Sequence, residues 1–193
     1  NKAAKDKEYD LIDKLSKKLP EKTLVVVTVH RRENHGENIA SVANAVFKLL
    51  EKHKDLIIVW PVHPNPKVKD TVYSAFFNAS SEVKDRLYLT EPLNYPILLW
   101  LLKNCWLVLT DSGGIQEEAV ALNKPILVLR ETTERQEIID AGAGILVGTD
   151  CKDIISNFEE LSKNIEKYEL MCNVINPFGD GTTSKAICDI LIK

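Results

Sequence analysis

Apolar, β-branched runs alternate with amphipathic segments along almost the whole chain, and this alternation restricts the fold more than any other feature. The run Leu-Val-Val-Val-Thr-Val at 24–29 has no polar alternation, which is typical of a strand covered by helices on both faces. Further strands are expected at 56–60, 86–89, 106–109, 125–129 and 144–147. Strands that alternate with helices form parallel βαβ units. The sequence therefore predicts the α/β class, with a doubly wound, mostly parallel, six-stranded Rossmann-like sheet.

The segments between these runs have helical periodicity. Between 37 and 53, for example, apolar residues recur at Ile39, Val42, Val46 and Leu50, which is the spacing of one helix face. Helices are predicted at 6–19, 37–53, 66–77, 95–102, 115–122, 153–162, 165–172 and from 183 to the end. The sequence has no internal repeat, low-complexity segment or linker, so we expect residues 1–193 to form one domain.

The composition excludes several classes of protein. An apolar fraction of 45% argues against disorder, and a net charge of −3 that is spread along the chain leaves no basic stripe for nucleic acid. No signal peptide or membrane-length apolar run is recognisable. The four cysteines form no CxxC pair. We therefore expect a cytoplasmic protein with reduced thiols, no nucleic-acid partner and no membrane contact.

One loop has the composition of an anion-binding site. The apolar run at 106–109 is followed by Asp-Ser-Gly-Gly at 111–114 and then by residues that suit a first helical turn. A helix N-terminus offers unpaired N–H groups and the positive end of a dipole, and glycines let a ligand approach the backbone closely. The loop predicts a phosphate site, and Glu117 or Glu118 could bind ribose hydroxyls beside it. Both glutamates would also stabilise a helix start without any ligand.

Polar clusters directly follow four of the predicted strands. They are His-Arg-Arg-Glu-Asn at 30–34, Val-His-Pro-Asn-Pro at 62–66, Asp-Ser-Gly-Gly at 111–114 and Arg-Glu-Thr-Thr-Glu-Arg at 130–135. The carboxyl ends of parallel strands lie along one edge of a sheet, where open α/β sheets bind their ligands. We therefore predict a nucleotide or nucleotide-sugar site that is built from these four clusters.

Individual residues of these clusters also have purely structural interpretations. His30 could cap a strand and bind a neighbouring loop, or it could act as an acid or base if a carboxylate fixes its tautomer. His63 could be a rigid turn residue or a ligand contact. Arg135 could pair with Glu131 or Glu134 at the surface, or it could contact an anion.

Other kinds of site are disfavoured by motif and spacing. No G-x-G-x-x-G follows the first strand, and the glycine-rich stretch at 142–148 precedes and contains a strand instead. A Walker A motif is missing, and Ser112 lacks the G-x-S-x-G context of a hydrolase nucleophile. We read Ser112 as a hydroxyl or backbone donor to phosphate. No recognised ligand spacing supports a metal site made from His30, His35, His63 and Asp111.

Six motifs occur in an order that resembles one family. They are His-Arg-Arg-Glu-Asn at 30–34, Pro-Val-His-Pro-Asn-Pro at 61–66, Thr-Asp-Ser-Gly-Gly-Ile-Gln-Glu-Glu-Ala at 110–119, Lys-Pro at 124–125 with Arg-Glu-Thr-Thr-Glu-Arg at 130–135, Leu-Val-Gly-Thr-Asp at 146–150 and Asn-Pro-Phe-Gly-Asp-Gly at 176–181. Together they resemble the C-terminal half of bacterial non-hydrolysing UDP-N-acetylglucosamine 2-epimerases. The resemblance extends over nearly the whole chain from Leu24 onward.

This resemblance implies an architecture and a reaction. The family is similar to GT-B glycosyltransferases, with two Rossmann-like domains around a cleft, and this chain resembles the second, UDP-binding domain. The implied reaction interconverts UDP-N-acetylglucosamine and UDP-N-acetylmannosamine by elimination of UDP to a 2-acetamidoglucal and re-addition. It requires no cofactor and no metal. The resemblance further implies a homodimer when the protein is full length, and a role in cell-envelope polysaccharide biosynthesis.

The resemblance also assigns roles to individual residues. It implies that His30 is catalytic at the reacting end of UDP, that Glu118 binds the ribose hydroxyls and that Arg135 contacts the ligand. The diphosphate loop matches Ser112, Gly113 and Gly114. The uracil pocket matches the backbone near Leu93 and the side chain near Leu98. Residues matched to a second, regulatory nucleotide-sugar site, or to its surroundings, are Arg31, Glu33, His63, Glu117 and Glu134.

The chain departs from the family pattern in four ways. Gln136 replaces a common proline, which changes the stiffness of the loop, and Leu98 replaces a common aromatic residue. Residues 70–85 are longer than in some relatives and are expected to form a surface loop. The chain starts with Asn1 in a helix-like segment, so we expect it to belong to a longer protein whose other domain carries further catalytic groups. The 193 residues alone are then expected to bind UDP weakly and not to epimerise.

Three other interpretations remain open at this point. The hydrolysing relative would release free N-acetylmannosamine, and a GT-B glycosyltransferase would use the same fold to bind its donor. A module that only binds its ligand would need no chemistry at all.

Overall fold

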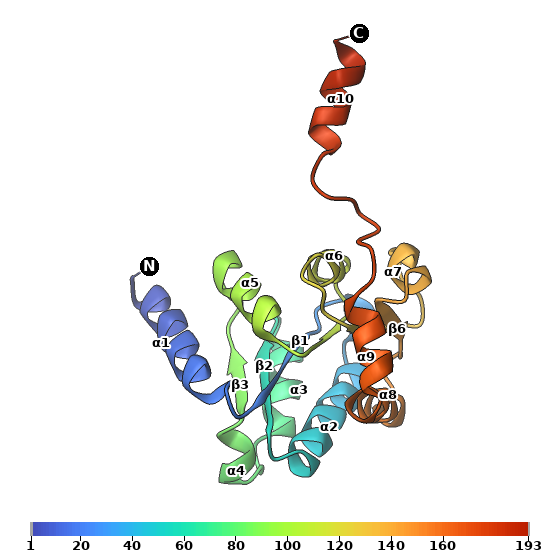
Figure 1. The fold of residues 1–193 in the computed structure, drawn as a ribbon. Helices are drawn as coiled ribbons and strands as arrows, with labels where there is room; N and C mark the ends of the chain where they lie inside the picture. The colour runs from blue at the N-terminus through green and yellow to red at the C-terminus, as the bar shows by residue number, and fades with distance from the viewer. Residues whose placement is uncertain (1, 193) are drawn as a thin grey trace.

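The computed structural model describes residues 2–192 and contains a six-stranded sheet (Figure 1). The strands are β1 (Thr23–Thr28), β2 (Leu56–Pro61), β3 (Leu87–Thr90), β4 (Leu107–Thr110), β5 (Ile126–Val128) and β6 (Gly144–Leu146). They lie in the order β3-β2-β1-β4-β5-β6, and every neighbouring pair is parallel. This is the doubly wound Rossmann order. The predicted α/β class and Rossmann-like sheet are therefore confirmed, and the sheet is parallel throughout.

Helices cover both faces of the sheet (Figure 1). The long helices are α1 (Lys2–Lys18), α2 (Glu37–Lys52), α3 (Pro66–Ala75), α5 (Tyr95–Asn104), α6 (Gly113–Ala121), α8 (Cys151–Lys163), α9 (Ile165–Cys172) and α10 (Thr183–Leu191). Apolar side chains of α2, α3, α8 and α9 form one core with the sheet, and those of α1, α5 and α6 form the other. Each core needs its own set of strand side chains, because successive strand residues point to opposite faces.

The first strand supplies both cores. Val25 and Val27 belong to the core beneath α2, whereas Leu24 and Val26 belong to the core beneath α5 and α6. All four side chains are at most 1% exposed. This arrangement explains why the run is apolar at successive positions, since neither face of β1 meets water.

Polar residues fix several helix ends. The Asn65 side chain accepts a hydrogen bond from the Lys67 N–H group at the start of α3, and Pro66 occupies the first helical position. At the C-terminal end of α2, the buried Arg86 donates to the carbonyl groups of Leu50 and His53, and also to that of Leu56 at the start of β2. Arg86 thereby satisfies carbonyl groups that the end of a helix leaves unpaired.

The observed helix and strand ends differ from the predicted ones mostly by one or two residues, as is usual for pattern-based boundaries. Three short helices were missed: η1 (Arg32–Asn34), α4 (Ser81–Lys84) and α7 (Gln136–Asp140). Segments of three to five residues contain too few positions to show a helical period. Gln136 is the first residue of α7 and donates to the Asp140 carboxylate at 3.0 Å, so the departure from proline there is accommodated in a helix.

The expected surface loop at 70–85 is wrong. This segment contains the end of α3 and all of α4, and three of its apolar side chains reach the core: Val72, Phe76 and Val83 are at most 4% exposed, whereas Phe77 is exposed. Ser80 caps α4 by accepting a hydrogen bond from the Val83 N–H group. The segment is therefore part of the helical layer that covers β2.

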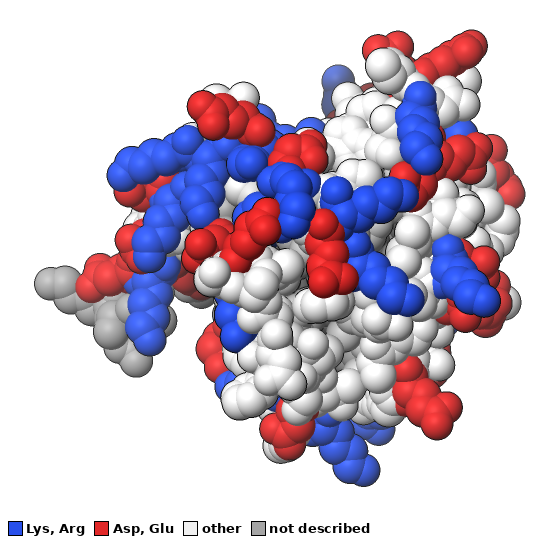
Figure 2. Space-filling view, turned by 90° about the horizontal axis from the view of Figure 1, so that it is seen from below, with Lys and Arg blue, Asp and Glu red and all other residues white. Residues whose placement is uncertain are grey.

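Charges of both signs mix on one face of the molecule, and α10 stands apart from the rest of the fold. The face seen from below carries lysine and arginine side chains interleaved with aspartate and glutamate, with no patch of a single sign (Figure 2). None of the helices in the described part of the chain is long and apolar enough to cross a membrane. At the other end of the molecule, α10 extends away from the sheet and has no buried residue (Figure 1).

Candidate functional site

The carboxyl edge of the sheet brings the four polar clusters together. The loops that follow β1, β2, β4 and β5 carry His30, His63, Ser112 and Arg135 respectively. Side-chain contacts join the loop after β1 to the other three, because His30 is close to both Asp111 and His63, and Arg31 pairs with Glu134. The clustering expected from the parallel sheet is therefore present.

Asp111 is the hub of this edge. Its side chain is fully buried, and its two oxygens accept hydrogen bonds from the backbone N–H groups of His30 and Arg31 and from Nδ2 of Asn34, at 2.8–3.1 Å. His30 Nδ1 lies 3.1 Å from Asp111 Oδ1. Burial alone would raise the pKa of Asp111, but the hydrogen bonds from His30, Arg31 and Asn34 outweigh burial and hold the pKa below its ordinary value.

His30 and His63 form one wall of a cavity. Their rings are nearly parallel, at an interplanar angle of 18°, and their centroids are 6.5 Å apart. The cavity has a volume of about 190 Å³ and is lined by Thr28, Val29, His30, Pro61, His63, Pro92, Leu93 and Leu98. The Leu93 and Leu98 region expected to hold uracil thus opens into the same cavity as His30.

His63 takes part in a turn as well as in the cavity wall. Its Nδ1 accepts a hydrogen bond from the Asn65 N–H group at 3.2 Å. The two interpretations of His63 as a turn residue and as a cavity residue are therefore compatible.

The loop after β4 opens a helix, as expected. Ser112 is the N-cap of α6, and its Oγ accepts a hydrogen bond from the Ile115 N–H group at 3.4 Å. The helix starts at Gly113, two residues before the predicted start. Helix geometry leaves the N–H groups of Gly113 and Gly114 without intrahelical partners. The Ser112 hydroxyl accepts this bond but keeps its own O–H to donate, so the hydroxyl and the two glycine N–H groups are the anion donors of this loop.

Arg135 lies against the start of α6. A Cβ atom added at Gly113 would come within 3.8 Å of the Arg135 Cζ atom. The guanidinium pairs with Glu117, not with Glu131 or Glu134 as the sequence suggested. Thr133 holds this loop in place, because its hydroxyl donates to the buried Gln116 side chain and accepts from the Arg135 N–H group.

A separate network of charges joins the loops after β1 and β5. Arg130, whose side chain is only 8% exposed, donates to Glu33 and Glu134, and Arg31 donates to both oxygens of Glu134. The hydrogen bond from Arg130 is the main reason that the pKa of Glu134 falls to about 2. Arg31, Glu33 and Glu134 thus form one ion network, and Arg130 at its centre was missed because Arg-Glu pairs are common at surfaces.

Glu118 has an unsatisfied group at this edge. Its Oε2 is buried and accepts no hydrogen bond within the described chain. The charge of Glu118 is the main reason that the pKa of Tyr95 is raised, which indicates that the Tyr95 hydroxyl lies close to this carboxylate. Tyr95 begins α5 and was not predicted as a site residue. A buried carboxylate oxygen without a donor is suited to a hydroxyl-rich ligand.

Residues 2–192 contain no group of three or more His, Cys, Asp or Glu side chains that could hold a metal ion. His35 is part of the row of imidazoles at the edge, with its ring centroid 6.4 Å from that of His63. It does not join His30, His63 and Asp111 in a ligand cluster.

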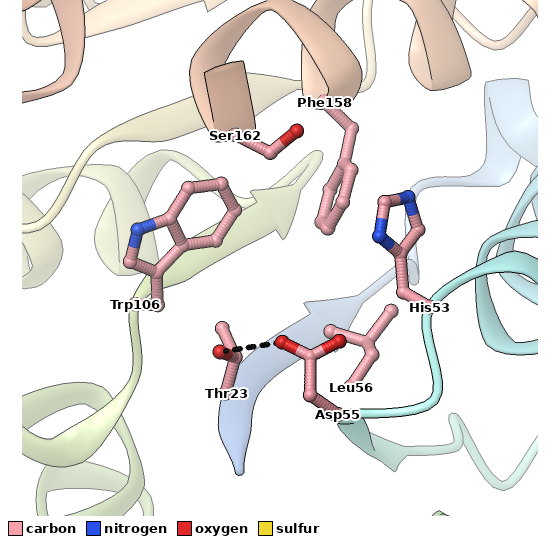
Figure 3. Close-up of a pocket in the computed structure, with 7 residues that line it drawn as sticks. All are labelled: Thr23, His53, Asp55, Leu56, Trp106, Phe158 and Ser162. Atoms are coloured by element: carbon pink, nitrogen blue, oxygen red, sulfur yellow. Dashed lines mark hydrogen bonds between the residues drawn. The ribbon is translucent and has the colours of Figure 1, made fainter. Parts of the chain in front are cut away.

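A second cavity lies at the opposite, amino edge of the sheet (Figure 3). It has a volume of about 180 Å³ and is lined by Thr23, His53, Asp55, Leu56, Trp106, Phe158 and Ser162. Beside it, Glu159 accepts from His53 Nε2 at 2.7 Å and pairs with Lys52 and Lys163. No sequence motif pointed to this cavity, and its residues lie at or just before the starts of β1, β2 and β4 and on α8.

Comparisons with known proteins agree with this geometry. A family model described as UDP-N-acetylglucosamine 2-epimerase matches residues 1–192. The UDP-N-acetylglucosamine 2-epimerase of Escherichia coli (strain K12) is 40% identical over 172 residues, which are 89% of this chain and 44% of that protein. The chain thus spans less than half the length of this relative.

Two solved structures share the fold. UDP-GlcNAc 2-epimerase from Neisseria meningitidis, solved bound to UDP-GlcNAc, is 39% identical with a TM-score of 0.81, over 89% of this chain and 45% of that one. The S. aureus MnaA-UDP co-structure is 37% identical with a TM-score of 0.83, over 91% of this chain and 47% of that one. The order of the motifs, the strand order and these matches lead to one conclusion: the chain belongs to the UDP-N-acetylglucosamine 2-epimerase family.

Proposed function

We propose that residues 1–193 form the UDP-binding domain of a UDP-N-acetylglucosamine 2-epimerase, an isomerase that interconverts UDP-N-acetylglucosamine and UDP-N-acetylmannosamine. One observation carries most of this proposal: His30, the start of α6 and Arg135 meet at one edge, beside an apolar cavity. Relatives of the same fold were solved with UDP-GlcNAc and with UDP, which supports the same ligand class for this chain.

The start of α6 is the proposed diphosphate site. The free N–H groups of Gly113 and Gly114 point from the positive end of the helix dipole. The guanidinium of Arg135 lies against the same turn and adds a permanent positive charge. Its present partner, Glu117, shares it, so a bound diphosphate would compete with Glu117 for the guanidinium. The same donors would stabilise UDP as a leaving group.

The remaining parts of UDP have proposed places along the same edge. The unsatisfied Glu118 carboxylate is assigned to the ribose hydroxyls, because a carboxylate accepts two hydrogen bonds from a diol. Leu93 and Leu98 line the cavity proposed for uracil. The aliphatic Leu98 offers apolar contact there without the stacking that an aromatic side chain would provide.

His30 is the proposed catalytic residue of this domain. In the elimination, the C2–H proton passes to a base while the C1–O bond breaks and its electron pair leaves with UDP. A C1=C2 double bond forms. Re-addition returns a proton to the other face of C2 and UDP to C1, so the sequence is redox-neutral and needs no external oxidant. We assign His30 to a proton-transfer role at the reacting end of UDP, and further acid–base groups to the rest of the whole protein.

We propose that a further group of residues surrounds a regulatory nucleotide-sugar site or supports the catalytic one. This group consists of the Arg31, Glu33 and Glu134 network together with His63 and Glu117. The charged network spans the loops after β1 and β5, so a ligand that disturbs it would affect the loop that carries His30.

The proposal extends to the whole protein. We place it in the cytoplasm, as a homodimer that supplies a nucleotide sugar for cell-envelope polysaccharide. All four cysteines of the chain are free thiols, which is the state expected in a reducing compartment. Measuring the mass of the full-length protein in solution tests the dimer.

The reaction is tested with the full-length protein and UDP-N-acetylglucosamine in heavy water. We expect deuterium at C2 and reversible formation of UDP-N-acetylmannosamine, without net hydrolysis. Free N-acetylmannosamine as the main product would identify the hydrolysing reaction, and transfer of the sugar to an acceptor would identify a glycosyltransferase. Residues 1–193 alone are expected to bind UDP weakly and to give no exchange, and exchange by this fragment would refute its assignment as a half-site.

A further inference from the structure

We propose that Asp111 is a positioning residue that fixes the tautomer of His30, with the proton on Nδ1 and a free lone pair on Nε2 at the cavity. The consequence for catalysis rests on the function proposed above, whereas the tautomer rests only on the geometry of this edge.

The contacts of Asp111 determine which ring nitrogen carries the proton. The carboxylate accepts hydrogen bonds from two backbone N–H groups and the Asn34 amide, and His30 Nδ1 lies 3.1 Å from Oδ1, within ion-pair distance. An ionised carboxylate can only accept hydrogen bonds. Neutral His30 can therefore bond to it only with Nδ1 protonated.

Asp111 stays ionised at neutral pH. It has no exposed surface, and its pKa lies below the ordinary value because its hydrogen bonds outweigh the effect of burial. The surrounding network also fixes its orientation, since the backbone N–H groups of His30 and Arg31 both donate to the carboxylate. The Asp111 carboxylate is therefore ionised and held in one orientation, so it can orient the imidazole of His30.

The opposite side of the His30 ring is the side available to a ligand. Nδ1 faces the buried carboxylate, yet 43% of the side chain is exposed and the ring lines the cavity. Since Nε2 is on the other side of the ring from Nδ1, we infer that Nε2 is the nitrogen available to a ligand. A lone pair on Nε2 can accept a proton in the elimination and return it in the re-addition, whereas the other tautomer would present an N–H group in the same place.

His63 offers an internal comparison, because it is held in the opposite tautomer. Its Nδ1 accepts a hydrogen bond from the Asn65 N–H group, so neutral His63 carries its proton on Nε2. The two stacked rings therefore present one acceptor and one donor to the same cavity. If His30 and His63 only held their loops in place, their tautomers would have no reason to differ.

The first test is ¹⁵N-detected imidazole spectroscopy of the 193-residue chain above the pH at which both histidines are neutral. His30 is expected to show a protonated Nδ1 and an unprotonated Nε2, and His63 the reverse. His30 with its proton on Nε2, or as an even mixture of tautomers, would overturn the proposal without any variant.

The second test uses Asp111→Asn. The fixed N–H group of Arg31 should keep the amide oxygen on its own side, which turns the amide NH₂ toward His30 Nδ1. We expect Nδ1 to become an acceptor and the His30 proton to move to Nε2. Asn34→Ala is the matched control, because it removes another donor to Asp111 but leaves His30 Nδ1 in place, so the tautomer should not change. A folded D111N protein with an unchanged His30 tautomer would contradict the proposal.

The kinetic consequence is measured in the full-length protein. D111N should lower kcat by about 10²–10⁴-fold, the usual contribution of acid–base catalysis, with little change in KM. Asn34→Ala should affect kcat far less. If wild-type protein does not epimerise, the proposed function fails while the tautomer assignment can still hold. If D111N inverts the tautomer but epimerises at the normal rate, only the positioning role fails.

Discussion

The guanidinium of Arg135 lies directly against Gly113, so that a Cβ atom at position 113 would be 3.8 Å from Arg135 Cζ. A positive side chain and the N-terminus of α6 thus face the same small space. Both favour an anion there, and Gly113 leaves the space open. This relationship supports the proposed diphosphate site and gives it a clear steric requirement.

Gly113→Ala should lower the affinity for UDP without destabilising the fold. The added methyl group meets Arg135 only at ordinary contact distance, and alanine is the better helix former. The unfolding free energy should be unchanged or rise by up to about 1 kcal/mol. UDP affinity should fall about tenfold or more, a loss of at least about 1.4 kcal/mol, because the methyl group occupies the ligand's space. Calorimetric titration and thermal unfolding measure the two effects.

The matched control for this variant is Ser156→Ala, an exposed position on α8. It should also keep or slightly raise the melting temperature, and it should leave UDP binding as it was. Normal UDP affinity in G113A would place the diphosphate elsewhere.

Glu118→Gln should weaken UDP binding while leaving pyrophosphate binding intact. Hydrogen bonds to a charged group contribute about 1.5–3 kcal/mol, and the amide replaces that charge with a neutral acceptor and donor. The pKa of Tyr95 should fall toward its ordinary value in the same variant, since the charge of Glu118 is the main cause of its rise. Competition binding with the two ligands and spectroscopic titration of tyrosine test this. An equal loss of affinity for UDP and for pyrophosphate would argue against a contact between Glu118 and the ribose.

Arg130→Met should destabilise the fold by about 1–2 kcal/mol at neutral pH, because Glu33 and Glu134 lose their shared donor but are about half exposed, so water screens the loss. Glu134 has a lowered pKa of about 2, so its stabilising effect is complete above its unfolded pKa of about 4.5 and disappears as the pH falls to about 2. As the pH falls from about 4.5 to about 2, the unfolding free energy of the wild-type protein should decrease by this contribution, and that of R130M should decrease less.

Urea unfolding at pH 7 and pH 3 measures the difference. The control is Lys69→Met, which removes an exposed pair with Glu91 and should change stability by less than about 1 kcal/mol. An R130M protein as stable as wild type at pH 7 would show that the network is not part of the fold's stability.

Glu159→Gln tests the amino edge as a structural region. Hydrogen bonds from Lys52 and His53 hold the pKa of Glu159 at about 2, so its contribution is present above its unfolded pKa and lost as the pH falls to about 2. The variant should lose about 1 kcal/mol at neutral pH, which is typical of a small charge network. The difference from wild type should shrink at acid pH. UDP affinity should not change, since the cavity in Figure 3 lies at the edge opposite His30.

Much of the fold was predictable because strand and helix patterns are local. The apolar run of β1 and the helical period of α2 are visible in the sequence, and parallel strand order then places the loops on one edge. The expectation for 70–85 was wrong because it rested on the length of the segment relative to the family. Val72, Phe76, Ala79 and Val83 recur at intervals of three and four residues, which is a helical spacing, and all four are buried in the core beneath α2.

The meeting of the loops at the candidate site was predictable, but the contacts between their side chains were not. The motifs identified His30, Ser112 and Arg135, since each follows a strand. They did not show that Arg135 pairs with Glu117, or that Asp111 is the hub for His30, because both contacts join residues at least 18 positions apart. Tyr95 was missed for the same reason, as its neighbour Glu118 lies on another helix.

Residue-resolved titration of UDP into the 193-residue chain tests the central claim most directly. We expect weak binding in which the largest NMR shift changes belong to Gly113, Gly114, Arg135 and His30 at the carboxyl edge, with Trp106 at the amino edge unchanged. Saturable shifts centred on Trp106, or no saturable shift at all, would contradict the assignment of this domain as the UDP-binding half of an epimerase.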